Sequence, residues 1–319
     1  MDLITCKLYR IQRKRDLAVL LKIENIKKIG QISNSYRPYI ANETKKRLIE
    51  PVESEELKKI QKNIQLLLKE IKYNDNVFSG VPGKSYIDNG KYHIGCKNIV
   101  ALDISKFFPN INREKVYNFF KYKMENSSDV AKILTDLCTI DLRKIYNLDK
   151  NVIEYINEKK IRFMNHIPTG SSISCILSYL VNYIMFDEID TLCREYNCKM
   201  SVYVDDIVIS SSEIINNNLI SKVIAIIKNN GYRISKSKLK HYKTNEFKRV
   251  TGSILSKDGK KLVVPNKIKY RRIKITKNTL LSNEEKERKR NGYDNVIKQI
   301  KLGRWWNCFT LQAIHIVIF

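Results

Sequence analysis

Three aspartates that interrupt apolar, strand-like sequence limit most strongly how this chain can fold. Asp103 follows Ile-Val-Ala-Leu, and Asp205-Asp206 stand between Ser-Val-Tyr-Val and Ile-Val-Ile-Ser. Burying a carboxylate costs several kcal/mol unless the group is paired or binds a metal. At a hairpin bend both acids of the pair can approach one cation, and a third acid from a neighbouring strand completes an oxygen-rich site. The pattern therefore favours a Mg²⁺ site over the simple turn or cap that a lone Asp-Asp pair would indicate.

A large excess of positive charge narrows the partners. The 319 residues include 59 Lys and Arg against 33 Asp and Glu, which gives a net charge of +26. With 43% hydrophobic residues the composition is that of a folded protein. Such an excess destabilises a compact state by self-repulsion unless an anionic partner neutralises it. Composition alone leaves both nucleic acid and an anionic membrane as candidates.

The period of the apolar residues alternates between helix-like and strand-like segments. Residues 53–72 repeat apolar side chains every three or four positions, so we expect a helix there with Ser54 as its N-cap. We also expect helices at 113–123, 128–146, 172–196 and 216–230, strands at 98–104, 200–204, 207–210 and 232–234, and a loop over 77–91. This interleaving predicts an α/β or α+β fold.

Basic residues are densest from residue 266 onwards, in helix-like sequence. A lone run of charge is usually a solvated helical face, but in a chain of this net charge we favour a nucleic-acid-binding role. The sequence therefore predicts a basic helical domain over 262–319, after a larger unit over 1–261.

Neither end of the chain indicates export or membrane insertion. The first 21 residues lack the apolar core of a secretory signal, and the apolar run 308–319 is too short to cross a bilayer. The seven cysteines are odd in number and form no Cys-x-x-Cys pair. We expect reduced core thiols in a cytoplasmic protein, with disulfide or zinc roles as the less favoured reading.

Four segments together resemble the reverse transcriptases. Residues 203–206 read Tyr-Val-Asp-Asp, which is similar to the family's Tyr-x-Asp-Asp signature. The first acidic motif of the bacterial enzymes is matched by 103–109, their loop-to-helix motif by 167–174, and their next palm motif by 231–238. A basic segment ahead of them extends the resemblance to about residues 45–255. Elements in the family's order are far more specific than any one of them.

Two further matches resemble the retron subgroup of these enzymes. Residues 89–93, Asn-Gly-Lys-Tyr-His, are similar to its Asn-Ala-x-x-His signature, and 250–252 reproduce its Val-Thr-Gly signature. The chain departs from the subgroup where Gly90 replaces Ala, and where Thr169 and Cys175 stand in place of Gln and Pro.

The resemblance implies a right-hand polymerase, with fingers and palm around a small antiparallel sheet and a C-terminal helical thumb. It assigns the carboxylates to two Mg²⁺ ions that support in-line displacement at phosphorus. It also implies that a lysine acts on the leaving pyrophosphate, for which Lys236 and Lys240 are alternatives to Lys238. The catalytic residues would then be Asp103, Asp205, Asp206 and Lys238, with Ile104 joining the three aspartates at the metal.

The same resemblance implies contacts to the nucleotide. A basic pair would clamp the triphosphate, although a solvated basic turn, especially at Lys45, is an alternative. A phenyl ring beneath the sugar would clash with a 2′-hydroxyl and select dNTPs, unless it is simply a core aromatic beside Phe107. The implied substrate-binding residues are Lys46, Arg47, Phe108, Thr169, Gly170 and Tyr203.

Other residues are implied to bind RNA. The thumb would hold the template-primer duplex and, in a retron enzyme, a hairpin of the cognate non-coding RNA. For His93, as for His166, a core or surface position is the alternative. The implied RNA-binding residues are Asn89, His93, Lys267, Arg271 and Arg272. The apolar tail 305–319 has no counterpart in the usual thumb ending.

Taken together, the resemblance implies a retron reverse transcriptase that makes RNA-linked single-stranded DNA (msDNA) from its own non-coding RNA, primed from a 2′-hydroxyl, in anti-phage defence. Its expected partners are that RNA, the RNA/DNA hybrid, dNTPs and an effector or toxin protein, without a membrane. The chain leaves no room for a ribonuclease H or endonuclease domain of ordinary size. The alternatives are another defence-associated or group II-like bacterial reverse transcriptase, a catalytically silent RNA-binding scaffold and, least favoured, a membrane-surface protein.

Overall fold

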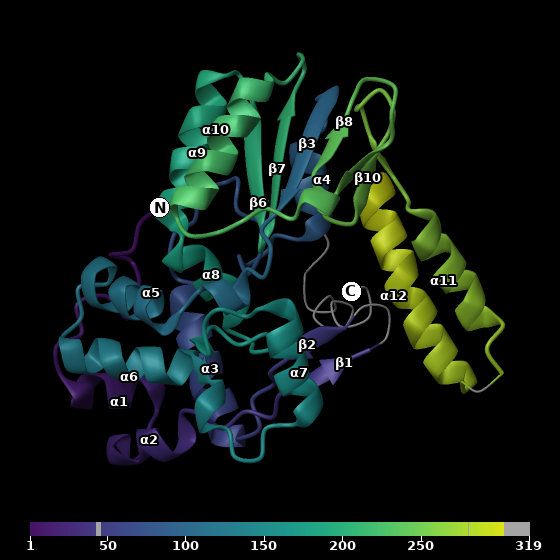
Figure 1. Ribbon diagram of the computed structural model, residues 1–319. Helices are drawn as coiled ribbons and strands as arrows, with labels where there is room; N and C mark the ends of the chain where they lie inside the picture. Colours follow the sequence, from purple (N-terminus) through teal and green to yellow (C-terminus); the bar gives the residue numbers. More distant parts are fainter. Residues whose placement is uncertain (43–45, 280, 303–319) are drawn as a thin grey trace.

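A four-stranded antiparallel sheet forms the centre of the computed structural model, which describes residues 1–42, 46–279 and 281–302 (Figure 1). The strand order is β6-β7-β3-β8, so β3 lies between two strands that follow it by more than 100 residues. The strands are β3 (Asn98–Asp103), β6 (Lys199–Tyr203), β7 (Asp206–Ser211) and β8 (Lys240–Tyr242). This arrangement brings distant aspartates to one end of the sheet, because Asp103 pairs with Asp206.

Both faces of this sheet are buried, each against a different hydrophobic cluster. Alternate side chains of a strand point to opposite faces, so one strand packs into both clusters. Val100 and Leu102 pack into the larger hydrophobic core, while Ile99 packs into a second cluster. Helices α9 (Tyr183–Glu195) and α10 (Asn217–Asn229) cover one face (Figure 1). The second cluster joins α4 (Tyr86–Tyr92) to the C-terminal elements.

The lower half of the molecule in Figure 1 is mostly helical. The predicted helix over 53–72 forms as α3, and Ser54 caps it by accepting a hydrogen bond from the Leu57 N–H. Two short antiparallel pairs, β1 with β2 and β4 with β5, lie in this half. Its elements are α1 (Lys14–Leu21), α2 (Ile29–Ile32), β1 (Tyr39–Ala41), β2 (Arg47–Ile49), α3 (Glu55–Leu68), α5 (Arg113–Asn118), α6 (Ser128–Cys138), β4 (Ile140–Asp141), α7 (Lys150–Lys159), β5 (Asn165–His166) and α8 (Ser174–Val181).

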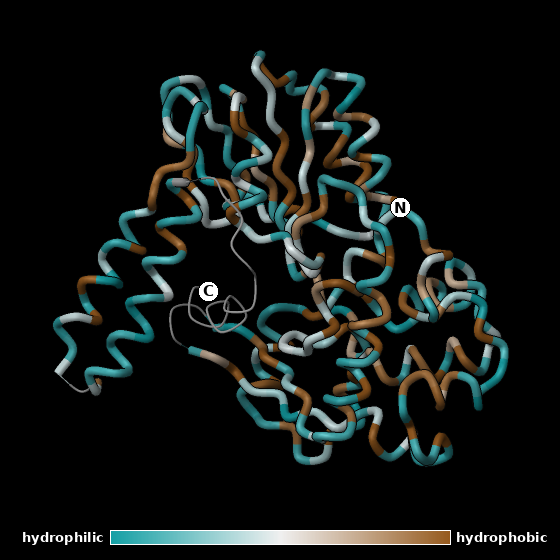
Figure 2. The backbone as a smooth tube through the Cα atoms, turned by 180° about the vertical axis from the view of Figure 1, so that it is seen from behind, coloured by the Kyte–Doolittle hydropathy of each residue, from teal (hydrophilic) through white to brown (hydrophobic). Residues whose placement is uncertain are grey.

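The C-terminal part begins with a small antiparallel sheet and ends in a helix pair that projects from it (Figure 1). Val296 and Ile300 of the second helix are buried in the second hydrophobic cluster and so join the pair to the main sheet. Figure 2 shows much of the pair as hydrophilic, whereas the central strands are largely hydrophobic. The elements are β9 (Lys248–Val250), β10 (Ser253–Leu255), β11 (Leu262–Val263), α11 (Asn266–Thr276) and α12 (Asn283–Leu302).

The mixed helix-and-sheet class is confirmed, but the predicted loop over 77–91 is partly wrong. Residues Tyr86–Tyr92 form helix α4, which a capping box begins: Ser85 Oγ accepts from the Asp88 N–H, and the Asp88 carboxylate accepts from the Ser85 N–H. This reciprocal cap stabilises a helix despite the glycine content of the segment.

Three other boundaries differ from the prediction. The helix expected over 128–146 ends at Cys138 and gives way to β4, while that over 172–196 divides at Asn182 into α8 and α9. The Asn182 amide donates to Ser178 O and accepts from the Tyr232 hydroxyl, so this residue is held at the break. The expected strand over 232–234 forms only a single bridge, between Ile104 and Ile234.

The cysteines of the described residues lie mostly in the core. The six cysteines in the described ranges are free thiols, and five of them are buried. Burial raises the pKa of the Cys193 thiol to about 12, so this group is a core side chain rather than a reactive thiolate. Within residues 1–42, 46–279 and 281–302, no helix has the length and apolar character needed to cross a membrane.

Candidate active site

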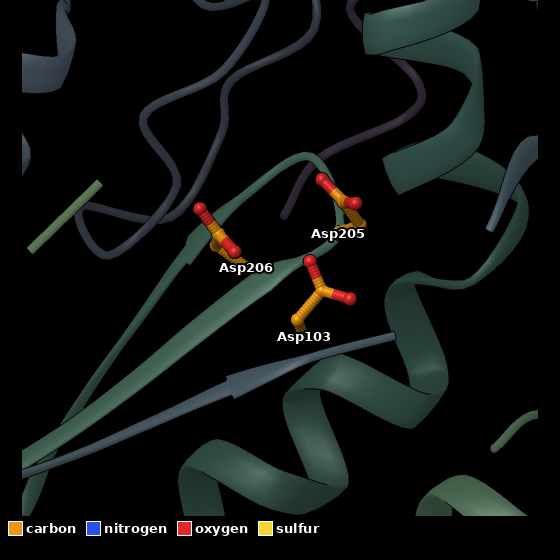
Figure 3. Close-up of side chains that lie close together, drawn as sticks. All are labelled: Asp103, Asp205 and Asp206. Atoms are coloured by element: carbon orange, nitrogen blue, oxygen red, sulfur yellow. The ribbon is translucent and has the colours of Figure 1, made fainter. Parts of the chain in front are cut away.

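The structure brings the three predicted aspartates together at one end of the central sheet. Oxygen atoms of Asp103, Asp205 and Asp206 lie within 4.8 Å of one another (Figure 3). Asp103 ends β3, and Asp206 begins the neighbouring strand β7. Asp205 lies in the two-residue turn between β6 and β7, whose other residue, Val204, has φ +58°. A β-branched residue is strained there, where glycine is preferred, and such strain is found where a turn aims functional groups.

The carboxylates of this cluster oppose one another electrostatically. Burial, followed by the charge of Asp103, raises the pKa of Asp205 to about 6. Burial and the charges of Asp205 and Asp103 raise the pKa of Asp206 to about 7. Asp103 is buried, whereas the other two remain partly exposed and so are open to a substrate. Because these pKa values are raised, the cluster readily binds a cation or protons, either of which reduces its negative charge.

The donor set of the cluster fits Mg²⁺. It consists of carboxylate oxygens, the hard ligands this ion prefers, on the adjacent strands β3 and β7 and on the β6–β7 turn. Ile104 is fully buried, and its N–H donates to Asp205 O over 2.9 Å. Its side chain carries no ligand atom, so any metal ligand from this position is the backbone carbonyl.

Lys238, in the segment predicted to act on the pyrophosphate, contacts the carboxylate cluster. It ends a short 3₁₀ turn (Lys236–Lys238), and its ammonium donates a hydrogen bond to Asp103 Oδ2. Its side chain is 54% exposed while that of Asp103 is 8% exposed, so the lysine reaches the acid from the solvent side. The ammonium is therefore accessible to an anionic group that approaches from solvent.

The predicted basic pair divides between two environments. Arg47 lies on β2, and its charge lowers the pKa of Asp205 against the larger effect of burial, so it is near enough to act on the cluster. Lys46 instead lines a cavity of about 260 Å³ with Asp149 and Glu158 of the α7 region. Lys45, the third member of the basic segment, lies outside the described residues.

The loop before α8 approaches β2 closely. Gly170 has φ +113°, and a Cβ at this position would lie 3.3 Å from Ile49 Cγ2, so glycine is needed for both conformation and space. The Thr169 N–H donates to Glu50 Oε2 over 2.8 Å. Ser171 Oγ donates to Gln61 Oε1 over 2.6 Å, and Gln61 is itself fully buried. Both ends of the loop are therefore fixed, one to Glu50 after β2 and the other to Gln61 on α3.

Two predicted aromatic residues take different positions. Phe108 begins a 3₁₀ turn (Phe108–Asn110) and is partly buried against the core. Its neighbour Phe107 is the core aromatic, in ring contact with Phe186 and Tyr232. Tyr203 is 6% exposed and packs in the second hydrophobic cluster, opposite Asp206 in the sheet.

The residues of the two retron-like signatures contact each other inside the protein. Asn89 is fully buried, and its Nδ2 donates to Thr251 Oγ1 over 2.9 Å. Thr251 and Gly252, with φ of +42° and +92°, form the two-residue turn between β9 and β10. A Cβ on Gly90 would lie 2.7 Å from Ser253 Cβ, which explains why this chain has glycine where the subgroup has alanine.

His93 is also fully buried, so the structure places neither Asn89 nor His93 at a surface that RNA could touch. The His93 ring nitrogens lie 2.6 Å from Ser210 Oγ and 2.7 Å from Ser201 Oγ. Burial lowers the pKa of this histidine to about 3, so the ring is neutral. These contacts favour the predicted alternative of a core histidine, and any effect of Asn89 and His93 on RNA binding is through the shape of the protein.

The predicted thumb residues lie on α11. Arg272 pairs with Asp294 of α12 over 2.6 Å and so joins the two helices. Burial, followed by the charges of Arg271 and Arg249, lowers the pKa of Lys267, which places these three cations near one another. The charge of Arg249 also acts on Asp206. Basic residues therefore extend from Arg249, near the carboxylate cluster, to Lys267 and Arg271 on α11.

Sequence reasoning missed two groups at this site. Arg249 directly precedes the Val-Thr-Gly signature, and its charge acts on Asp206 although the two residues are far apart in the sequence. Glu50 stands between Ile49 and Pro51, an acid in apolar sequence like Asp103, and that signal could have identified it. It is fully buried and pairs with His166, as described below.

Comparison with known proteins identifies the class of this protein. The family model described as reverse transcriptase (RNA-dependent DNA polymerase) matches residues 26–270. The chain therefore belongs to the reverse transcriptase family, as the sequence motifs predicted.

Within that family the chain is similar to retron enzymes. It is 28% identical over 239 residues to the Retron Se72 reverse transcriptase of Salmonella heidelberg, covering 70% of this chain and 56% of that protein. It is 26% identical to the Retron Ec83 reverse transcriptase of Escherichia coli, over 49% of this chain and 46% of that one. The Retron Ec48 reverse transcriptase of Escherichia coli is 28% identical over 36% of this chain and 29% of its own length. The chain thus matches about half of the length of such relatives, or less.

Proposed function

We propose that this protein synthesises DNA on an RNA template by two-metal nucleotidyl transfer. The observation that carries the proposal is the carboxylate cluster of Asp103, Asp205 and Asp206, with cationic side chains on its solvent side. A protein that only bound RNA would gain nothing from three clustered acids beside phosphates. Membership of the reverse transcriptase family supports the same activity.

In this proposal each group at the site has a separate role. Bound to the three carboxylates, Mg²⁺ would activate the attacking hydroxyl and stabilise the leaving oxygen. Lys238 leaves Asp103 and donates a proton or a hydrogen bond to the leaving pyrophosphate. Arg47 neutralises charge on the triphosphate from the fingers side.

We assign sugar selection to Phe108 and template contacts to the Thr169–Gly170 loop. Phe108 lies in the turn after β3, five positions after Asp103, and its ring lies against Phe107 at a centroid distance of 6.1 Å. A ring fixed in this way cannot retreat from a 2′-hydroxyl. Replacement by alanine should therefore admit ribonucleotides, and unchanged rejection of rNTPs by Phe108→Ala would contradict the assignment.

The similarity to retron enzymes supports a more specific proposal. The template would be a structured non-coding RNA, held on α11 by Lys267 and Arg271 and primed from one of its own 2′-hydroxyls, so that msDNA is the product. We extend the proposal to anti-phage defence with an effector partner. Loss of protection in a plaque assay on carboxylate substitution would support that role, and retained protection would contradict it.

The first experiment is dNTP incorporation by the purified protein with its co-purified RNA in Mg²⁺. The control is the double variant Asp205→Ala, Asp206→Ala, and RNase treatment follows synthesis. DNA made by the wild type alone, and still joined to RNA, supports both the polymerase and the retron proposals. If neither protein extends any primer-template, the activity proposal fails and a silent RNA-binding scaffold becomes the better interpretation.

A further inference from the structure

A buried ion pair between Glu50 and His166 connects the end of β2 to the segment between β5 and α8. Glu50 follows β2, His166 ends β5, and both side chains have no exposed surface. His166 Nε2 lies 3.0 Å from Glu50 Oε1. The other carboxylate oxygen, Oε2, accepts from the Thr169 N–H over 2.8 Å, and the Glu50 N–H donates to Thr169 O over 2.6 Å. Glu50 therefore binds the histidine and the loop backbone at once.

The surroundings of His166 require a charged ring. Its second nitrogen, Nδ1, lies 2.7 Å from the carbonyl oxygen of Phe163. With Glu50 ionised, both ring nitrogens face oxygen atoms that accept, and only the imidazolium has a proton to donate at each. The charged groups around it are Glu50 and, from β4, Asp141, which is paired with Arg143. Burial alone would lower the pKa of His166, but Glu50 raises it above its ordinary 6.5.

We propose that His166 is a positioning residue for nucleotide binding, which holds Glu50 so that the Thr169 backbone stays against the strand that carries Arg47. Arg47 is three residues before Glu50, and Thr169 and Gly170 form the facing loop. The pair fixes the spacing between these two sides of the nucleotide site without touching the substrate. When His166 loses its proton, the ring can donate to only one of these two oxygen atoms, and Glu50 is held less firmly against the Thr169 backbone. The proposal rests on the proposed function only where it names the nucleotide as the ligand.

The first test measures protonation and does not need an active enzyme. Nitrogen NMR of the wild type, with the His166 signals assigned by their loss in His166→Gln, should show protons on both ring nitrogens near neutral pH. Hydrogen exchange at the Thr169 amide should accelerate about tenfold in Glu50→Gln, because an amide has one acceptor oxygen where the carboxylate has two. A neutral His166 at pH 6.5, or unchanged exchange at Thr169, would overturn the proposal.

The second test separates positioning from chemistry. In His166→Gln, the KM for dNTP should rise about tenfold while kcat changes less than about threefold. The wild type should show the same rise in KM as the pH increases above the pKa of His166, and the variant should lose that pH dependence. His241→Gln, which removes an exposed histidine on β8, is the matched control. A variant that keeps the wild-type pH dependence of KM shows that the pair has only a structural role.

The two tests also separate this proposal from the proposed function. If the protein makes no DNA under any condition, the NMR and exchange measurements still decide whether the pair holds the loop. If DNA synthesis is normal and His166 is neutral, the positioning role fails and the polymerase proposal stands.

Discussion

Two groups of buried acids in this protein differ in how their charge is balanced. Glu50 has a cationic partner and a backbone donor, so both of its oxygens are satisfied within the protein. At the carboxylate cluster three acids share Lys238, and two of them have raised pKa values. The first arrangement satisfies its charge within the fold, while the second destabilises the fold until an external cation binds. An unbalanced acid in apolar surroundings is thus a better indicator of chemistry than burial alone.

The largest expected effect tests the chemical role of the unbalanced acids. Asp206→Asn keeps the shape of the side chain but removes one negative charge from the cluster. We expect DNA synthesis to fall by about a thousandfold or more, because charge stabilisation at the reacting phosphate is lost. Steady-state incorporation of dNTPs measures it, with Glu188→Gln on the outer face of α9 as control. Activity within about tenfold of the wild type would remove Asp206 from the mechanism.

A conservative change at Glu50, the acid whose charge is balanced, should lower the stability of the fold. Glu50→Gln leaves the charged His166 without its counterion inside the protein. We expect the free energy of unfolding to fall by about 3 kcal/mol, the usual cost of breaking a buried ion pair. Urea unfolding at neutral pH measures this, and Glu188→Gln should leave the midpoint unchanged. A stability equal to that of the wild type would show that the pair contributes nothing to the fold.

The same Asp206→Asn variant should be more stable than the wild type when metal is absent. The pKa of Asp206 is about 7 in the folded protein against 3.8 ordinarily, so its ionisation opposes folding. This cost is present in full above pH 7 and disappears as the pH falls towards 3.8. We expect a gain of about 2 kcal/mol at pH 7.5 after allowance for solvent screening.

Thermal unfolding in EDTA, compared between the wild type and Asp206→Asn across pH, measures this gain. The difference between the two proteins should shrink towards acid pH. A variant that is less stable than the wild type at pH 7.5, or a difference independent of pH, would contradict the electrostatic account.

The smallest expected effect concerns the neutral histidine. Because the pKa of His93 is about 3 when folded and 6.5 ordinarily, its contribution to stability is complete above pH 6.5 and is lost as the pH falls towards 3. At pH 5.5 we expect the wild type to lose about 1.4 kcal/mol relative to His93→Gln, compared with their difference at pH 7.5. Parallel stability curves for the two proteins would show that His93 does not titrate in this way.

Much of the site could be predicted because its residues are marked locally. Asp103, Asp205 and Asp206 each stand in apolar sequence, and the pairing of β3 with β7 brings them to the same end of the sheet. Lys238 was recognisable only through the resemblance, since Lys236 and Lys240 are equally basic neighbours. The fold class followed from the change of period along the chain.

The missed features depend on contacts between distant segments or on weak local signals. Glu50 and His166 are 116 residues apart. The residues around either one do not indicate that the other lies beside it and neutralises its charge. Helix α4 was hidden by the glycines around it, although Ser85 and Asp88 formed a readable capping box. The break at Asn182 depends on the Tyr232 hydroxyl, 50 residues later.

The contact between Asn89 and Thr251 has a consequence for recombination between relatives. The two signatures are 162 residues apart, yet the amide of one holds the left-handed turn of the other, and Gly90 leaves just enough room for Ser253. A crossover placed anywhere between the two signatures would take these contacting residues from different parents, whose side chains need not fit each other. Chimaeras that exchange the C-terminal helices should therefore either take α4 from the same parent or leave the β9–β10 hairpin behind.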